Sequence, residues 1–263
     1  MSPADAGPGP RFPTCASADE LRQNLVEVRS RIAAAADRAG RSAEEVRLLP
    51  VTKTMGEGPI RWLSESGVGL VGENKAQEAR SKADLFTELD LEWAMIGHLQ
   101  TNKVNQVVGS AVELHSLDRL ELAERLDRRL QADGTTLDVF IQVNSSGEDS
   151  KFGLAPAAVE AFARSIEHMH SLKVRGLMTL AVFSSDEAKV RACFETMVDL
   201  ADRLRQNLPD PSAFAELSMG MSGDYELAIE HGATTVRVGQ ALFGARQLGA
   251  DHYWPPTNDQ GTR

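Results

Sequence analysis

Cysteine, excess basic charge and long apolar runs are all scarce in this chain. Only two of its 263 residues are cysteines, Cys15 and Cys193. That is too few for a disulfide framework or a cysteine-based metal site, and it suits a reducing cytoplasm. The 28 basic residues are outnumbered by 38 acidic ones, for a net charge of −10, which argues against nucleic acid or an anionic membrane as a partner. No apolar run approaches the roughly 20 residues of a membrane-spanning helix.

The ends of the chain differ from its middle. Residues 1–16 have proline and glycine where a signal peptide would need a basic and then an apolar stretch, so we expect a disordered leader. Residues 249–263 form a polar tail. Within 17–39 the apolar residues recur at spacings of four, three and four, which predicts an amphipathic helix.

After this helix, short β-rich apolar runs alternate with helical stretches. The runs cover residues 46–53, 68–73, 91–97, 111–117, 137–144, 172–180, 213–219 and 235–238. Eight such units in about 200 residues are typical of a TIM barrel. A doubly wound sheet is the alternative, but its first turn usually carries a glycine-rich fingerprint, which VTKTMGEG lacks. We therefore predict an α/β fold: a single TIM (β/α)8 barrel over 17–248 with an extra N-terminal helix.

Active sites of such barrels gather at the carboxyl ends of the strands, and Lys53 closes the first predicted strand. Lys53 lies two residues after Val51 and four after Leu49, so the three side chains would share one face of a strand. The Lys53 side chain is therefore expected to point into the barrel mouth. Partial burial there would lower its pKa and leave the amine able to form a Schiff base with a carbonyl. A solvated lysine at a strand end is the alternative interpretation.

Two glycine-containing turns follow the seventh and eighth strands. The segments SMGMSGD (218–224) and VRVGQALFG (236–244) lie where TIM barrels commonly bind phosphate through backbone N–H groups. Either turn alone is a weak signal, because glycine after a strand is mostly turn chemistry. Together with Lys53 they indicate a pocket for a phosphorylated carbonyl compound.

Arg237 lies within the eighth strand, where a buried guanidinium needs an acceptor. A pyridine nitrogen is one acceptor, in an arrangement known for pyridoxal 5′-phosphate (PLP). A salt bridge to Glu73 or Glu216 is equally compatible with the spacing. Asn74, after the second strand, could orient a ring hydroxyl or cap the next helix.

Metal and hydrolase signatures are absent from the sequence. His168 and His170 are two residues apart, which does not place both on one helical face. His98 closes the third strand and is interpreted as a barrel-rim histidine. Neither a Gly-x-Ser-x-Gly elbow nor a His-Glu-x-x-His motif occurs. We predict no metal site.

Longer blocks carry a family resemblance over about residues 17–248. They are LLPVTKT, GENKAQEA, MIGHLQTNKVNQVV, DVFIQVNSSGEDSKFGL, VRGLMTL and LSMGMSGDYELAIEHGATTVRVGQALFGAR. In this order they resemble the PLP homeostasis protein family, also called YggS/PROSC proteins. The resemblance implies the barrel of PLP fold type III, similar to the N-terminal domain of alanine racemase.

The resemblance also implies roles for individual residues. Lys53 in VTKT would form the Schiff base with PLP, and Asn74 in GEN would contact the cofactor near its ring. Arg237 in TVRVG would face the pyridine nitrogen and leave it unprotonated, because arginine does not release its proton at ordinary pH. Such a ring is a poorer electron sink.

The phosphate would be held by the two glycine-containing turns. Ser222 in SMGMSGD would touch it, as would the backbone of Gly239 and Gln240 in VGQ. Three positions depart from the usual family pattern, of which Gln240 stands where a small hydroxyl residue is common and puts cofactor affinity in doubt. Phe152 and Val182 are the other two.

The expected function is that of a non-catalytic PLP carrier. A PLP racemase needs an acid/base on each face of the cofactor, and Tyr225 and Tyr253, the only tyrosines, have no obvious route to the second face. We expect binding of PLP, delivery to PLP-dependent apoenzymes, and a monomer, since the dimerising domain of the racemase is missing. A single-domain amino-acid racemase of low activity, a class I aldolase using Lys53 without PLP, and a purely structural barrel are the alternatives.

Overall fold

Residues 12–244 are described by the computed structural model, and the structural statements below concern them. Its strands are β1 Arg47–Pro50, β2 Leu70–Glu73, β3 Glu92–Met95, β4 Glu113–Leu117, β5 Leu137–Val143, β6 Leu172–Thr179, β7 Glu216–Ser218 and β8 Thr235–Val238. All pair in parallel, in the order β1-β8-β7-β6-β5-β4-β3-β2. A parallel bridge between Val51 and Gly72 joins the two end strands. The predicted (β/α)8 barrel is therefore confirmed.

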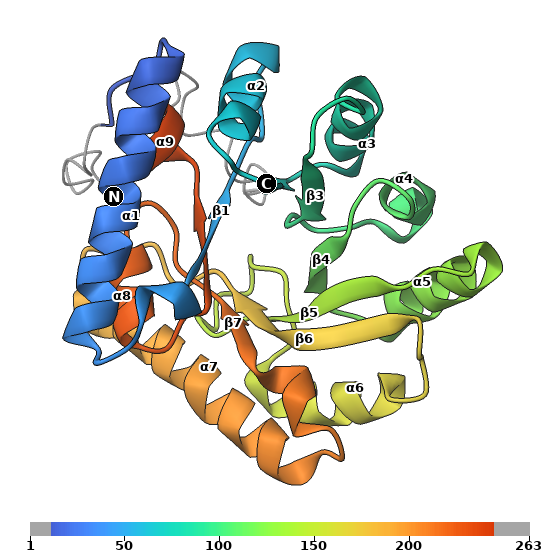
Figure 1. Cartoon of the computed structure of the whole chain (residues 1–263). Coiled ribbons are helices and arrows are strands. Elements are labelled where there is room, and N and C mark those ends of the chain that lie inside the picture. The colour runs from blue at the N-terminus through green and yellow to red at the C-terminus, as the bar shows by residue number, and fades with distance from the viewer. Residues whose placement is uncertain (1–11, 245–263) are drawn as a thin grey trace, which may run out of the picture.

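Helices surround the strands (Figure 1). They are α1 Ala18–Arg38, α2 Glu57–Glu65, α3 Ala76–Leu85, α4 Val104–Val107, α5 Leu120–Asp133, α6 Val159–Ile166, α7 Glu187–Asn207, α8 Tyr225–Glu230 and α9 Gln240–Phe243. Short 3₁₀ turns occur at η2 Ala43–Glu45, η3 Thr101–Lys103, η4 Pro156–Ala158 and η5 Pro211–Phe214. In the described part of the chain, no helix combines the length and apolarity needed to cross a bilayer.

The extra helix α1 lies outside the ring and packs on α8 and α9 (Figure 1). The apolar stripe read from the sequence is its buried face: Leu21, Leu25, Val28 and Ile32 are each at most 4% exposed. The Ser17 hydroxyl accepts a hydrogen bond from the Glu20 N–H and caps the helix. Burying four aliphatic side chains contributes about 1.5–3 kcal/mol each, so this stripe is what attaches α1 to the barrel.

Seven of the eight strands are shorter than the predicted runs, two of them by four residues. The run 46–53 ends as a strand at Pro50, with one further bridge at Val51, and the chain then turns at Thr54, whose φ is +67°. The run 213–219 begins as a strand only at Glu216, because the 3₁₀ turn η5 occupies the preceding residues. Strand alternation therefore does not set the direction of the Lys53 side chain.

The predicted leader and tail fall mostly outside the described residues. Residues 1–11 and 245–263, which include the predicted tail 249–263, are not described. Of the predicted leader, residues 12–16 are described, and there the Cys15 N–H donates to the Phe243 carbonyl in α9.

Candidate functional site

Lys53 follows β1 at the carboxyl end of the barrel, in the turn between β1 and α2. Its side chain is half-buried, and the preceding Thr52 is fully buried. The Thr52 N–H donates to the Gly72 carbonyl of β2 at 3.0 Å, which continues the β1–β2 junction beyond the last paired residues. The lysine is thus attached to the rigid end of the barrel, in the region where this fold concentrates its chemistry.

Asn74 follows β2 and lies beside Gly97, which follows β3. A Cβ atom added at Gly97 would lie 2.1 Å from the Asn74 carbonyl oxygen and 2.6 Å from Asn74 Oδ1. Only glycine therefore allows the close approach of the two loops. Asn74 is exposed and does not cap α3, whose N-cap position is Lys75 and has no side-chain cap, so the capping alternative is wrong.

The loops after β7 and β8 meet, as the two predicted anion-binding turns require. The Ser222 hydroxyl oxygen accepts a hydrogen bond from the Ala241 N–H at 3.2 Å. Gly239 and Gln240 are the N-cap and first residue of α9, where backbone N–H groups have no partner within the helix. The structure therefore brings Ser222, Gly239 and Gln240 to one place.

The β7 loop is held in shape by glycine and an acidic side chain. Gly220 has a φ of +91°, and a Cβ there would lie 2.6 Å from that of Ala228. Asp224 Oδ1 accepts from the Met221 N–H at 2.6 Å, and burial raises the pKa of this carboxyl. The turn that carries Ser222 is thus fixed from both of its ends.

Arg237, in β8, is 3% exposed and has neutral hydrogen-bond partners. Its guanidinium donates to Ser218 Oγ and to the Thr179 carbonyl oxygen, both at 2.7 Å. The alternative interpretation, an ion pair of Arg237 with Glu73 or Glu216, is wrong. Glu73 pairs with Lys82, and Glu216 pairs with arginines at the opposite end of the barrel. Burial lowers the pKa of Arg237 to about 10, although the charge of Asp224 opposes this.

A chain of hydrogen bonds through the barrel interior fixes Arg237. Ser218 Oγ lies 2.9 Å from Nδ1 of the fully buried His115, and His115 Nε2 lies 2.7 Å from Glu113 Oε2. Arg47 pairs with both oxygens of Glu113. Burial lowers the pKa of His115 to about 4, so its ring is neutral at pH 7. The consistent pattern has Nε2 donating to Glu113 and Nδ1 accepting from Ser218, whose oxygen accepts from Arg237.

Tyr225 directly follows the β7 loop, but its ring packs against the outer helix α1. It begins α8, is 1% exposed, and its ring lies 5.6 Å from the guanidinium carbon of Arg31 in the outer helix α1. Its hydroxyl oxygen is buried without a hydrogen-bond partner among the described residues, and burial raises its pKa. The tyrosine therefore serves the packing between α8 and α1. Tyr253 lies outside the described residues.

Aromatic side chains occupy the rim between the β3 and β5 loops. The Phe152 ring stacks on His98 with 3.8 Å between ring centroids, and Phe152 is 55% exposed. His98 Nδ1 lies 3.4 Å from Asp118 Oδ2 but makes no hydrogen bond, and burial lowers the pKa of His98. Nothing in the structure explains the unusual valine at position 182. In residues 12–244, no group of His, Cys, Asp and Glu able to hold a metal ion is found.

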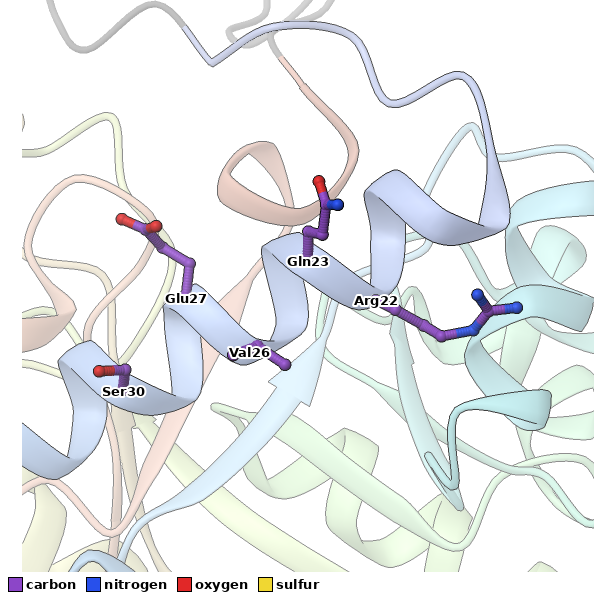
Figure 2. A pocket seen from close by; sticks show the side chains of 5 residues that line it. All are labelled: Arg22, Gln23, Val26, Glu27 and Ser30. Atoms are coloured by element: carbon purple, nitrogen blue, oxygen red, sulfur yellow. The ribbon is translucent and has the colours of Figure 1, made fainter.

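A depression of about 440 Å³ lies away from these loops, on the outer face of α1 (Figure 2). It is lined by the exposed residues Arg22, Gln23, Val26, Glu27 and Ser30. It is shallow and open, unlike the enclosed, largely apolar clefts that hold small ligands. The carboxyl ends of the strands remain the candidate site.

Several residues of this site were not found from the sequence. Lys82 in α3 is 8% exposed and hydrogen-bonds to the β1 end. The sequence does mark Lys82 as unusual. It follows Ala76 and Ala79 at a spacing of three and so falls on the buried face of α3, where a lysine is not expected. Ser218 and the interior His115 carried no comparable signal, since their roles depend on pairing between distant strands.

The comparisons with known proteins agree with this geometry. The model of the family "Alanine racemase, N-terminal domain" matches residues 19–247. A pyridoxal phosphate homeostasis protein of Aquifex aeolicus is 40% identical over 225 residues, covering 86% of this chain and 98% of that protein. The protein of the same name from Pseudomonas aeruginosa is 40% identical over 231 residues, covering 88% of this chain and 97% of its own.

Solved structures give the same result. An unknown protein from Bifidobacterium adolescentis is 37% identical with a TM-score of 0.80, covering 88% of this chain and 99% of its own. PipY of Synechococcus elongatus, solved with PLP bound, is 33% identical with a TM-score of 0.75, covering 85% of this chain and all of its own. Alanine racemase of Clostridium difficile shares the fold at 16% identity and a TM-score of 0.67, covering 88% of this chain and 58% of its own.

Proposed function

Because this chain belongs to the pyridoxal phosphate homeostasis protein family, we propose that it is a non-catalytic PLP-binding protein. It holds the cofactor as a Schiff base on Lys53 and serves intracellular PLP homeostasis and delivery. PLP bound to PipY, a relative of similar length, supports the choice of cofactor. A cytoplasmic location suits its free cysteines, Cys15 and Cys193.

The groups around the carboxyl ends of the strands fit the ring of PLP. Arg237 carries the argument: it is a buried cation whose hydrogen-bond partners, Ser218 and the Thr179 carbonyl, are neutral. Such a guanidinium can donate to a neutral ring nitrogen without a competing carboxylate contact. Asn74 lies after the neighbouring strand to Lys53 and contacts the cofactor near its ring.

The loops after β7 and β8 fit the phosphate. Ser222 supplies a hydroxyl beside the first turn of α9, and Gly239 and Gln240 supply backbone N–H groups. Gly239 leaves little room for a side chain, because a Cβ there would lie 3.3 Å from the Val51 carbonyl. Gln240 contributes its backbone, so the loss of a small hydroxyl at this position weakens the phosphate contact without removing it.

The proposed reaction is a reversible condensation between the Lys53 amine and the PLP aldehyde. PLP supplies an aldehyde that reacts with amines and a ring that accepts electrons. The unprotonated amine of Lys53 attacks the aldehyde carbon, a C=N bond forms, and one water leaves. The reverse reaction, or exchange with a free amine, releases the cofactor, and this is what delivery needs.

Two features of the site favour holding the cofactor over turnover. Arg237 keeps its proton, so a ring nitrogen facing it stays unprotonated and the ring is a weak electron sink. Tyr225, the one tyrosine in the described chain, is buried between α8 and α1. A racemase needs a second acid/base on the far face of the cofactor, and Tyr225 cannot serve there.

The protein acts as a monomer that hands PLP to apoenzymes.

The test is a transfer assay. The protein is loaded with PLP, freed of excess cofactor by gel filtration, and mixed with a PLP-free aminotransferase, whose regained activity is followed. We expect transfer from the wild type and from Lys75→Ala, an exposed lysine on the neighbouring loop, and little cofactor retained by Lys53→Ala. Equal retention and transfer by Lys53→Ala would contradict the proposal. Steady conversion of L-alanine or L-serine into its enantiomer would favour the alternative, a single-domain racemase of low activity.

A further inference from the structure

The backbone after Lys53 adopts a conformation that its sequence does not favour. Thr54 has a φ of +67° and is the one residue other than glycine with positive φ in the described chain. A β-branched residue in this region is a clear outlier, and such strain costs on the order of 1–3 kcal/mol. It persists only where the surroundings impose it, so something must hold the turn.

A buried lysine on α3 holds one side of this turn. The side chain of Lys82 is 10% exposed, and its Nζ donates to the Thr52 carbonyl at 2.8 Å. It also donates to Glu73 Oε1 and to Glu78 Oε1, each at 2.7 Å. The Thr52 carbonyl belongs to the peptide group immediately before Lys53.

The two carboxylates extend the contact to the other side. Glu78 Oε1 accepts from the Thr54 N–H at 2.7 Å, and this N–H belongs to the peptide group immediately after Lys53. Glu73, which is fully buried, accepts from the Thr52 hydroxyl at 2.6 Å. Both peptide groups that flank Lys53 are therefore bound by one cluster, which we define as Lys82, Glu73 and Glu78.

Stability alone is a weak reason for this cluster. Desolvating a lysine and a carboxylate costs several kcal/mol per ion, and a buried ion pair is often no better than apolar side chains of similar size. The position of Lys82 would accept such a residue, since Ala76 and Ala79 precede it on the same buried stripe. What apolar packing could not do is bind a carbonyl before Lys53 and, through Glu78, an N–H after it.

We infer that Lys82 is a positioning residue for Lys53: with Glu73 and Glu78 it fixes the strained turn so that the Lys53 amine meets the PLP aldehyde in a reactive orientation. The inference rests on the proposed Schiff base at Lys53. It assigns the cluster no contact with PLP. Removing Lys82 therefore affects the condensation and leaves the noncovalent docking of ring and phosphate intact.

The experiment separates condensation from docking. Its variants are Lys82→Met, which keeps the length of the side chain, and Glu78→Ala, at a position exposed enough to keep the fold. Arg41→Met is the matched control, because Arg41 also binds carbonyls, those of Ile229 and Ala233, and a carboxylate, but at the amino-terminal end of the barrel. The rate of Schiff base formation at saturating PLP is measured by absorbance. Docking is measured as the affinity for pyridoxine 5′-phosphate, which has no aldehyde.

We expect condensation about tenfold or more slower in Lys82→Met and Glu78→Ala, because small displacements of a reacting group have effects of this size. Their affinity for pyridoxine 5′-phosphate is unchanged, and Arg41→Met condenses at the wild-type rate. Wild-type rates in both cluster variants, or equal slowing in Arg41→Met, would overturn the inference. A wild type that forms no borohydride-reducible adduct on Lys53 would instead refute the proposed function on which it rests.

Discussion

Replacing Arg237 by methionine distinguishes a cofactor ligand from a structural arginine. The guanidinium is buried and donates to Ser218 Oγ and to the Thr179 carbonyl. A structural arginine would be expected to stabilise the protein that contains no cofactor. An arginine kept for a ligand costs stability until the ligand accepts one of its hydrogen bonds.

The magnitude follows from the pKa of Arg237, which burial lowers from the usual value of arginine to about 10 against the attraction of Asp224. A tenfold change in acidity equals about 1.4 kcal/mol, so the folded chain holds this charge at a cost of about 3 kcal/mol at pH 7. The charged form is the one disfavoured, so this cost is complete below pH 10 and shrinks as the pH rises from there toward the ordinary pKa of arginine. Methionine removes the cost together with two charge-assisted hydrogen bonds, each worth about 1.5 kcal/mol at the lower end of their range. The changes nearly cancel.

We expect the free energy of unfolding of the PLP-free protein to change by less than about 1 kcal/mol in Arg237→Met, as measured by urea denaturation at pH 7. PLP affinity should fall by about 10-fold to 150-fold, which corresponds to one charge-assisted hydrogen bond of about 1.5–3 kcal/mol. Arg41→Met is the control, with lower stability and unchanged affinity. A loss of more than about 3 kcal/mol in Arg237→Met, with affinity retained, would refute the reasoning.

Three further predictions concern other parts of the site. Burial lowers the pKa of His115 to about 4, so only the unfolded chain takes up this proton between pH 6.5 and 4; stability falls by about 3 kcal/mol as pH drops through this window. His115→Gln should remove that fall in urea titrations at pH 7 and pH 4, and an unchanged fall would refute it. Gly97→Ala pushes Asn74 aside and should weaken PLP binding, as measured by direct titration. Gly69→Ala, with no atom within 4 Å of its Cβ, should leave PLP binding unchanged. Equal effects of the two substitutions would refute the contact between Asn74 and PLP. Tyr225→Phe removes a buried unpartnered hydroxyl and should raise the free energy of unfolding by about 1 kcal/mol, with PLP transfer unchanged; loss of transfer would place Tyr225 in the site.

The barrel could be predicted from the sequence because its signals are local. Eight apolar runs and the helices between them are set by short-range periodicity, and all eight strands overlap the predicted runs. The ends of the strands were less predictable. The strand expected to reach Lys53 stops at Pro50, and the chain takes a left-handed turn at Thr54, whose N–H is bound by a side chain of α3. No pattern within 46–53 carries that information.

The site was predictable only in part, for the same reason. Ser222, Gly239 and Gln240 were recognised as turn residues after strands, and the closure of the barrel brings them together. The partners of Arg237 were not recognised, because Ser218 and the Thr179 carbonyl come from β7 and β6. Side chains that meet inside a closed barrel depend on strand order and register, which are properties of the whole fold.

The central claim, a covalent link between PLP and Lys53, is tested most directly by reduction and mass mapping. The protein is incubated with PLP, treated with borohydride, digested, and searched for the peptide that carries the reduced adduct. We predict that the adduct lies on Lys53, that Lys75→Ala keeps it, and that Lys53→Ala loses it. An adduct of undiminished yield in Lys53→Ala, carried by another lysine, would contradict the account.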